Sequence, residues 1–200
     1  MDPRFLTLMG MVFLCLHLLA GCSGTRPALQ EFKVAPPVQA CRVGVLPFVN
    51  RSGYDQGERI LYRILLAELV PQRPWHLALE GDVRLIYREL RLRPWIRPSP
   101  EQMRIIASRL GADILVGGEI LEMEEEVQGE WVNPRLKMQL HVYSGKDGTL
   151  LWTTYHGKQG TDYRKIMHFG LSNSVSQLGK KMMKEILILW EEKGLLVCSD

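Results

Sequence analysis

Residues 113–121 read Asp-Ile-Leu-Val-Gly-Gly-Glu-Ile-Leu. A short run of apolar, mostly branched residues of this length is typical of a buried strand. Gly117 and Gly118 inside it indicate either a bulge or a close approach of another chain segment to the backbone. We therefore assign this run to a strand, and assign the flanking segments outward from it.

The residues that follow this strand predict an antiparallel meander and a long helix. Residues 122–131 are acidic and are expected to form a turn or arm. Residues 136–143 alternate between apolar and polar side chains, as a half-buried strand does. A turn at 144–148 then leads into a strand at 149–156. The apolar stripe that comes next predicts a helix that opens at Asp162 and runs to about residue 193.

The residues that precede the strand alternate between strand and helix patterns. The apolar run 42–48 predicts a buried first strand, and a helical period begins at Gly57 and stops at Pro71. A short strand is expected at 75–79, followed by a helix to about residue 92 with Asp82 as its cap.

The clearest helix start lies at residue 99. Ser99 occupies the cap, Pro100 the first turn and Gln102 the capping-box position. Gly111 is the expected C-terminal cap of the same helix.

This order of elements predicts an α/β fold, in the form of an α+β sandwich. We expect a small mixed sheet with an antiparallel C-terminal meander, packed by about four helices. If the last helix packs antiparallel to the first strand, Cys41 and Cys198 lie at the same end of the sheet, and a disulfide between them is expected. Two unpaired thiols near the ends of the fold are the alternative.

The N-terminal residues 1–21 have the pattern of a cleavable export signal, with Arg4 ahead of a long apolar run. Residues 19–22 read Leu-Ala-Gly-Cys, which resembles the lipobox of bacterial lipoproteins. The resemblance implies cleavage before Cys22 and acyl chains on its thiol, which anchor the protein to a membrane. Ser23 in place of Asp implies the outer membrane, with the domain in the periplasm or facing outside. An ordinary secretory signal that happens to end in cysteine is the alternative.

Residues 22–40 contain three prolines and no sustained period, and are expected to be a lipidated tether. The remainder, 41–200, is long enough for a single α/β domain. Hydrophobic residues make up 46% of the 200-residue chain, so a sizeable core is expected. The formal net charge of +3 is too small to indicate a nucleic-acid partner.

Basic residues gather in one notable cluster. A solvated helix face explains the cluster, and contact with anionic lipid or glycan is the alternative. Its members are Arg84, Arg88, Arg91, Arg93 and Arg97.

Sequence motifs of catalysis and metal binding do not match this chain. It has no G-x-S-x-G elbow, no phosphate loop, no H-E-x-x-H and no C-x-x-C, so we predict no catalytic residue, no metal and no cofactor. His141 and His156 are expected to face each other across the hairpin, as a surface pair rather than a metal site. The acidic residues 122–126 lack the order of a calcium loop and are expected to lie in a solvated hairpin tip.

Four short motifs resemble a recurrent envelope-protein pattern. They are Val45-Leu-Pro-Phe48, Asn50-Arg-Ser-Gly53, the run from Leu110 to Gly118, and Gly148-Thr-Leu-Leu-Trp152. The pattern is similar to the TolB N-terminal domain, to the curli-secretion lipoprotein CsgG and to the lipoprotein LpoB. The resemblance implies a small mixed sheet with helices packed on it, no catalytic residues, and function through protein contacts.

The sequence thus predicts a non-catalytic, membrane-anchored lipoprotein that acts as an adaptor or assembly factor in the cell envelope. Its envelope partner is not identified by the sequence. Two alternatives stay open: a homo-oligomeric component of a secretion or export apparatus, as CsgG is, and an enzyme of unrecognised type. The candidate partner contacts are Asn50, Arg51, Ser52, Tyr54 and the aromatic Trp131.

Overall fold

A mixed seven-stranded sheet forms the centre of the protein in a computed structural model that describes residues 26–32, 38–71, 75–129, 131–165 and 169–198. The predicted α/β fold class is confirmed. The strand order is β1-β8-β7-β6-β3-β5, with β4 paired to β6. The seven strands are β1 (Ala28–Glu31), β3 (Arg42–Val45), β4 (Val49–Asn50), β5 (His76–Leu77), β6 (Ile114–Gln128), β7 (Trp131–Ser144) and β8 (Leu150–Gln159).

Four α-helices occur in the described ranges, which agrees with the predicted number: α2 (Gly57–Leu69), α3 (Glu80–Glu89), α4 (Pro100–Leu110) and α5 (Val175–Glu192). A short 3-10 helix, η1 (Gly160–Tyr163), follows β8. A second, two-stranded sheet pairs β2 (Val38–Gln39) with β9 (Leu196–Val197). None of the helices in the described part of the chain is long and apolar enough to cross a membrane.

The antiparallel pair β6–β7 is the longest pairing in the sheet. Its register runs from Ile114 opposite Ser144 to Gln128 opposite Trp131, with one irregularity between Ile120 and Glu122. The predicted alternation holds in β7, because one set of its side chains is fully buried under α2 and α5. These side chains are Leu136, Met138, Leu140 and Val142.

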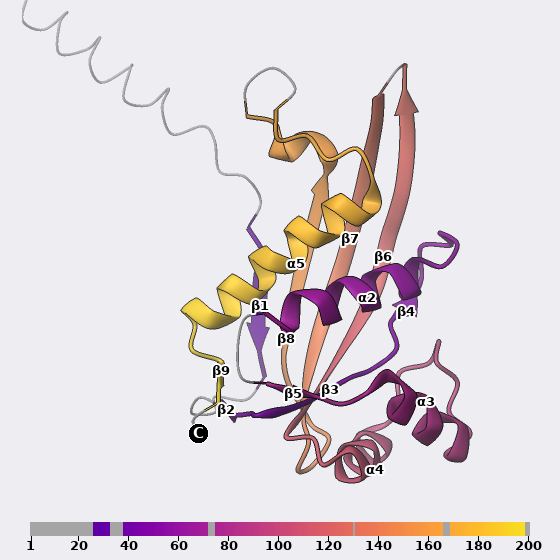
Figure 1. The fold of residues 1–200 in the computed structure, drawn as a ribbon, viewed down its shortest axis with the longest axis vertical. Coiled ribbons are helices and arrows are strands. Elements are labelled where there is room, and N and C mark those ends of the chain that lie inside the picture. The colour runs from indigo at the N-terminus through magenta and orange to yellow at the C-terminus, as the bar shows by residue number, and fades with distance from the viewer. Residues whose placement is uncertain (1–25, 33–37, 72–74, 130, 166–168, 199–200) are drawn as a thin grey trace, which may run out of the picture.

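Helices cover both faces of the sheet. In Figure 1, α2 and α5 lie side by side across one face, and α3 and α4 pack at the β3–β5 end of the other. Leu115 and Tyr143 contact the second pair of helices, while their strand neighbours Ile114 and Val142 face the first. Alternation along the strands therefore divides the buried side chains into two clusters, one on each face.

In the run 113–121, the glycine at position 118 is required by a neighbouring ring. A Cβ atom at this position would lie 2.1 Å from Cε1 of the buried Phe48 ring, so only glycine leaves room for the ring. Of the two expectations for Gly117-Gly118, the close approach is confirmed at Gly118. The irregularity of the strand lies further on, at Leu121.

The predicted tether is wrong for residues 28–31. These residues form β1, which pairs antiparallel with β8 from Ala28 opposite Tyr155 to Glu31 opposite Trp152. The pairing satisfies the main-chain edge of β8 that would otherwise be exposed, and Leu29 packs against the core. A four-residue strand is too short to show a period in the sequence.

Of the two expectations for residues 122–131, the arm is confirmed and the turn is not, because β6 continues through this stretch to Gln128. Cross-strand ion pairs join Glu122 to Lys137 and Glu124 to Arg135, so the acidic side chains are compensated within the hairpin. The two strands are joined through Gly129, whose φ of 63° suits glycine. Trp131 is consequently the first residue of β7.

The helix boundaries agree with the sequence where a cap is well defined. The capping box of Ser99 and Gln102 and the left-handed Gly111 are both present. Asp82 does not cap α3, because the helix begins at Glu80 and Asp82 lies in its first turn.

The last helix does not open at Asp162. The Asp162 carboxylate instead accepts a hydrogen bond from the backbone N–H of Gln159 and caps η1. Ser174 is the N-cap of α5, and its Oγ accepts from the backbone N–H of Gln177. The structure describes no residue between 165 and 169, so the predicted helix residue Ile166 lies outside the described ranges.

A disulfide joins Cys41 to Cys198 across 157 residues of sequence. It lies beside the β2–β9 pair, where the C-terminal residues return to the beginning of the domain. Cys41 immediately precedes β3, and its backbone N–H donates to the carboxylate of Asp113, just before β6. The disulfide therefore connects the end of the chain to the central strands.

Reduction of this disulfide is expected to lower the free energy of unfolding by up to about 5 kcal/mol, because the bond closes a loop of nearly the whole domain in the unfolded chain. Urea unfolding with and without dithiothreitol measures the difference. The Cys198→Ser variant is the control, since dithiothreitol should leave its stability unchanged. An unfolding midpoint of the parent protein that does not respond to reduction contradicts the prediction.

Candidate interaction site

The β6–β7 hairpin extends beyond the rest of the sheet (Figure 1). β8 pairs with β7 only as far as Arg135, so residues 125–129 and 131–134 project past it; we call these residues the arm. Val127 is 71% exposed and Trp131 is 47% exposed near its end. The arm thus presents an aromatic and an aliphatic side chain at the tip of a rigid two-stranded element.

Ion pairs brace the base of the arm. The Arg135 guanidinium lies 3.1 Å from a Glu124 oxygen and 2.5 Å from a Glu126 oxygen. The backbone N–H of Val175, at the start of α5, donates to the Glu125 carboxylate at 2.8 Å. These contacts attach the hairpin to the helical layer and hold its direction.

The predicted contact loop, residues 50–54, is closed on itself by Asn50. The Asn50 side-chain oxygen accepts from the N–H and the hydroxyl of Ser52, and its amide donates to the Tyr54 carbonyl at 2.8 Å. The amide also donates to Glu58 in the first turn of α2. Asn50 and Ser52 therefore shape the loop, and we find no free side-chain function to assign to Asn50.

The loop lies along β6 at the base of the arm. Arg51 Nε donates to Glu119 at 2.7 Å, and the Tyr54 hydroxyl donates to Glu125 at 3.3 Å. Burial and the negative charge of Glu125 raise the pKa of Tyr54. The structure thus brings this predicted loop to the hairpin, while Trp131 lies further out along it.

A hollow of about 120 Å³ lies next to Trp131. The Asn133 side-chain oxygen accepts from the Thr161 N–H at 3.3 Å and helps to fix its floor. Arg164 and Ser172 line its other side. This hollow can hold one side chain of a partner beside the indole.

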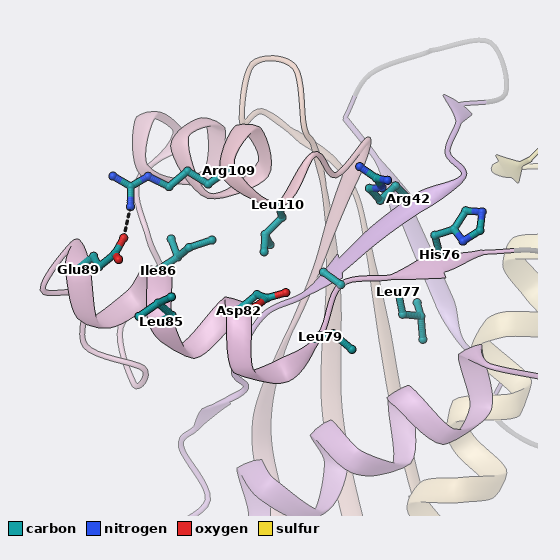
Figure 2. A pocket seen from close by; sticks show the side chains of 11 residues that line it. Arg42, His76, Leu77, Leu79, Asp82, Leu85, Ile86, Glu89, Arg109 and Leu110 are labelled. Atoms are coloured by element: carbon teal, nitrogen blue, oxygen red, sulfur yellow. Dashed lines mark hydrogen bonds and ion pairs between the residues drawn. The ribbon is translucent and has the colours of Figure 1, made fainter.

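A second, larger hollow of about 540 Å³ lies at the β5 edge of the sheet, shown in Figure 2. Glu89 and Arg109 form an ion pair on one side of it, and Arg42 and His76 lie on the other. Apolar side chains of α3 and α4, including Ile86 and Leu110, lie between them. None of the predicted contact residues lines this hollow.

A polar network connects β6, β7 and the segment between α3 and α4. Glu119 accepts from Arg97 at 2.9 Å as well as from Arg51. Arg97 also donates to His141 Nε2 at 2.8 Å, so the proton of the neutral ring is on Nδ1, which donates to Thr153 at 2.9 Å. The network attaches the α3–α4 segment to the sheet.

The network favours ionised Glu119 and neutral His141. Burial alone would raise the pKa of Glu119, but the hydrogen bond from Arg51 and the charge of Arg97 outweigh it and lower the pKa. Burial and the charge of Arg97 lower the pKa of His141 to about 4, against the opposing effect of Glu119. Arg97 therefore meets one anionic and one neutral acceptor.

The two histidines do not face each other, so the predicted surface pair is wrong. His141 lies opposite Thr153 and points to the α3–α4 side, whereas His156 lies opposite Met138 and contacts Glu185 of α5 at 2.5 Å. The two side chains lie on opposite faces of the sheet, so they cannot meet across the hairpin. Both rings are also buried rather than at the surface. Among the described residues, no three histidine, cysteine or acidic side chains converge as metal ligands would.

The sequence places Arg97 in a basic cluster but does not predict its contacts with Glu119 and His141. The signal was present in residues 93–98, Arg-Pro-Trp-Ile-Arg-Pro, where two apolar side chains stand between arginines and prolines. Such a segment has no strand or helix period, and its contacts with Glu119 and His141 are visible only in three dimensions.

His141→Gln is expected to flatten the dependence of stability on pH. The folded pKa of about 4 lies below the ordinary value of about 6.5, so the unfolded state binds the proton first and stability falls as the pH drops from about 6.5 to about 4. Between pH 7 and pH 5 this loss amounts to about 2 kcal/mol, and the variant should lack it. Urea unfolding at the two pH values tests this.

His156→Gln is the matched comparison for that measurement, because burial also lowers the pKa of His156 although Glu185 opposes the shift. Each variant should remove only its own share of the pH dependence. If the free energy of unfolding depends on pH equally in the parent protein and in His141→Gln, the placement of a neutral histidine beside Arg97 is contradicted.

No protein-family model matches the sequence, and no curated protein matches it. Among solved structures, the chain is similar to the PelC dodecamer from Paraburkholderia phytofirmans, with 12% identity and a TM-score of 0.54 over 80% of this chain and 94% of that one. Lipoprotein GNA1162 from Neisseria meningitidis gives 12% identity and a TM-score of 0.54 over 76% of this chain and 99% of that one. The LpoB C-terminal domain from Escherichia coli gives 17% identity and 0.46 over 62% and 87%, a likeness too weak to argue from. The chain thus has the fold of PelC and of lipoprotein GNA1162.

Proposed function

We propose that this chain is a non-catalytic lipoprotein of the bacterial cell envelope that binds other envelope proteins as an adaptor or assembly factor. The observation that carries the proposal is the arm, which exposes Val127 and Trp131 near the end of the hairpin. Tryptophan is enriched among the residues that dominate protein–protein binding energies. Because the arm is braced by ion pairs and by α5, little ordering accompanies binding.

The loop at 50–54 is a second candidate contact, at the base of the arm. Ser52 and Tyr54 lie where the hairpin leaves the sheet, and Arg51 is ion-paired and partly exposed there. A partner that contacts both would span the hairpin, because Trp131 lies beside residues 161–173 and the loop lies along β6. We assign Trp131 the larger share of the affinity and the loop a polar rim.

A second candidate function is assembly into a ring or export apparatus of identical subunits. The fold shared with PelC, which was crystallised as a dodecamer, favours this candidate. In such an assembly the arm of one subunit would contact the next. The adaptor and the ring thus differ in what Trp131 touches: another envelope protein, or a second copy of this chain.

A photo-reactive phenylalanine analogue in place of Trp131 separates these candidates. In cells that make the full chain, we expect irradiation to yield one dominant crosslinked product, which mass spectrometry identifies as an envelope protein or as the chain itself. The exposed Phe32 donates its N–H to Leu151 at the start of β8, at the end of that strand away from the arm; it takes the same analogue as control and should yield neither. A Trp131→Ala chain should bind the recovered partner at least tenfold more weakly. Crosslinks to lipid alone would overturn the proposal.

The membrane attachment in this proposal is assigned to Cys22, which lies outside the described residues. Its support is the lipobox-like Leu-Ala-Gly-Cys at 19–22 and the apolar run ahead of it. Two or more acyl chains on that cysteine would make attachment durable. Ser23 favours the outer membrane, with the domain in the periplasm.

Mass spectrometry of the mature protein tests the anchor. We expect an N-terminal Cys22 carrying diacylglycerol and a further acyl chain, and recovery of the protein with membranes. The Cys22→Ser variant should lose the modification, whereas Cys15→Ser, within the predicted signal, should keep it. An unmodified Cys22 thiol in the mature chain contradicts the assignment.

A further inference from the structure

The segment between α3 and α4 exposes two large apolar side chains. Trp95 is 61% exposed and Ile96 is 50% exposed, and they are adjacent in sequence. We call residues 91–98 the Arg-Trp loop, which joins the two helices at the side of the molecule (Figure 1). An exposed indole beside an exposed branched aliphatic side chain makes a small apolar patch on this loop.

The Arg-Trp loop is held in place, so its exposed pair is not a frayed end. Its first residue, Arg91, has a φ of 52°, and the Leu92 N–H donates to the Tyr87 carbonyl at 2.8 Å. The Ile96 N–H donates to the Arg93 carbonyl at 3.0 Å, which closes a turn around Trp95. A rigid loop presents its apolar pair with little loss of conformational entropy on binding.

Arg97 anchors the far end of the same loop to the sheet through Glu119 and the buried His141. The contacts of Arg97 with Glu119 and His141 thus fix the position of the exposed loop that carries Trp95. Removal of the Arg97 contacts would free the loop without touching the exposed pair.

Basic residues are frequent in the Arg-Trp loop and in the helix that leads into it. Arg84 pairs with Glu80 and Arg97 with Glu119. The exposed Arg88, Arg91 and Arg93 form no ion pair with any described residue. Arg91 and Arg93 thus belong to the same loop as Trp95 and Ile96, and Arg88 lies in the last turn of α3, which leads into it.

A small apolar patch with unpaired arginines in the same segment favours a lipid partner over a protein. Two partly exposed side chains offer on the order of 200 Å² of apolar surface, whereas a stable protein interface buries about 800 Å² on each side. A lipid interface needs no such area, since tryptophan resides at the headgroup level and each nearby arginine adds attraction to anionic lipid. Guanidinium groups also bind phosphate through two parallel hydrogen bonds.

We propose that the Arg-Trp loop binds the surface of a bilayer that contains anionic phospholipid. Trp95 and Ile96 enter the headgroup layer, and Arg88, Arg91 and Arg93 contact lipid phosphates. This contact is distinct from the acyl anchor and from the arm. It would fix the orientation of the domain on the membrane, which an N-terminal tether alone leaves free.

The orientation bears on the arm. Arg97 meets β6 at Glu119, and nine residues separate Glu119 from Gln128 at the end of the strand. At about 3.3 Å per residue, the tip lies roughly 30 Å from the loop contact. The Arg-Trp loop and the tip of the arm are therefore separate surfaces.

Tryptophan quenching by brominated lipids tests the proposal with the full chain. Vesicles of phosphatidylglycerol and phosphatidylcholine in equal amounts, with bromine on the acyl chains near the headgroups, should quench Trp95. The Trp95→Phe variant isolates this component by difference and keeps an aromatic ring. Vesicles of brominated phosphatidylcholine alone should quench it far less. Equal quenching of the parent protein and Trp95→Phe overturns the proposal, as does equal quenching by the two lipid mixtures.

Charge substitutions give a second measurement. Arg88→Gln, Arg91→Asn and Arg93→Gln together should lower the equilibrium constant for the loop contact on the order of 100-fold, at about 1 kcal/mol for each arginine. Asn is used at 91 because it tolerates the left-handed backbone. Arg63→Gln, Arg104→Gln and Lys193→Gln remove the same charge from exposed positions elsewhere and should leave the contact unchanged. Equal losses in both sets contradict a specific role for the loop.

The acyl anchor on Cys22 and the membrane contact of the Arg-Trp loop are tested independently. If Cys22 carries no acyl chain, the same vesicles can be added to the soluble chain, and the Trp95 signal still reports on the loop. If the arm binds no protein, that signal is unaffected. A photo-reactive residue at position 96 that crosslinks a protein instead of lipid would overturn the proposal.

Discussion

The long antiparallel pairing of β6 with β7 is the constraint on which the rest of the structure depends. From Ile114 to Gln128 the two strands remain in register apart from one irregularity, and every other strand of the main sheet is ordered relative to them. The near half of the pair carries the core, with helices packed on both faces. The far half projects as the arm. A single pairing thus supplies both the stability of the domain and its most prominent contact surface.

The polar residues of β6 act at the boundary between these halves. Glu119 joins the 50–54 loop to the Arg-Trp loop through Arg51 and Arg97, at the point where the parallel pairing of β4 with β6 begins. The ionised carboxylate is retained in a half-buried place because two guanidinium groups compensate its charge. Two segments that are far apart in the sequence are therefore fixed relative to the same strand by one side chain.

Local patterns in the sequence predicted the elements that carry strong signals. The capping box at Ser99, the period of α2 and the alternation of β7 each have a physical cause within a few residues, and all three are present. The elements that were missed depend on distant partners. β1 forms because β8 has a free edge, and β6 crosses the acidic stretch because Arg135 and Lys137 lie opposite its carboxylates. The same holds for the candidate sites. Trp131 is visible in the sequence as an aromatic residue in a polar segment. The role of Arg97 depends on Glu119 and His141, which are distant in the sequence.

The closure between the two ends of the domain has a mechanical consequence. A pull on the chain ahead of Ala28 first loads β1, a four-residue strand at the edge of the sheet, which can detach from β8 with the loss of few hydrogen bonds. Beyond it, the force passes through the β2–β9 pair to the disulfide between Cys41 and Cys198, which shares it between the start of β3 and the C-terminal segment. Strand β1 is therefore expected to detach before the disulfide-closed domain unfolds. The chain can lengthen under tension by several residues while its core and its arm keep their shape.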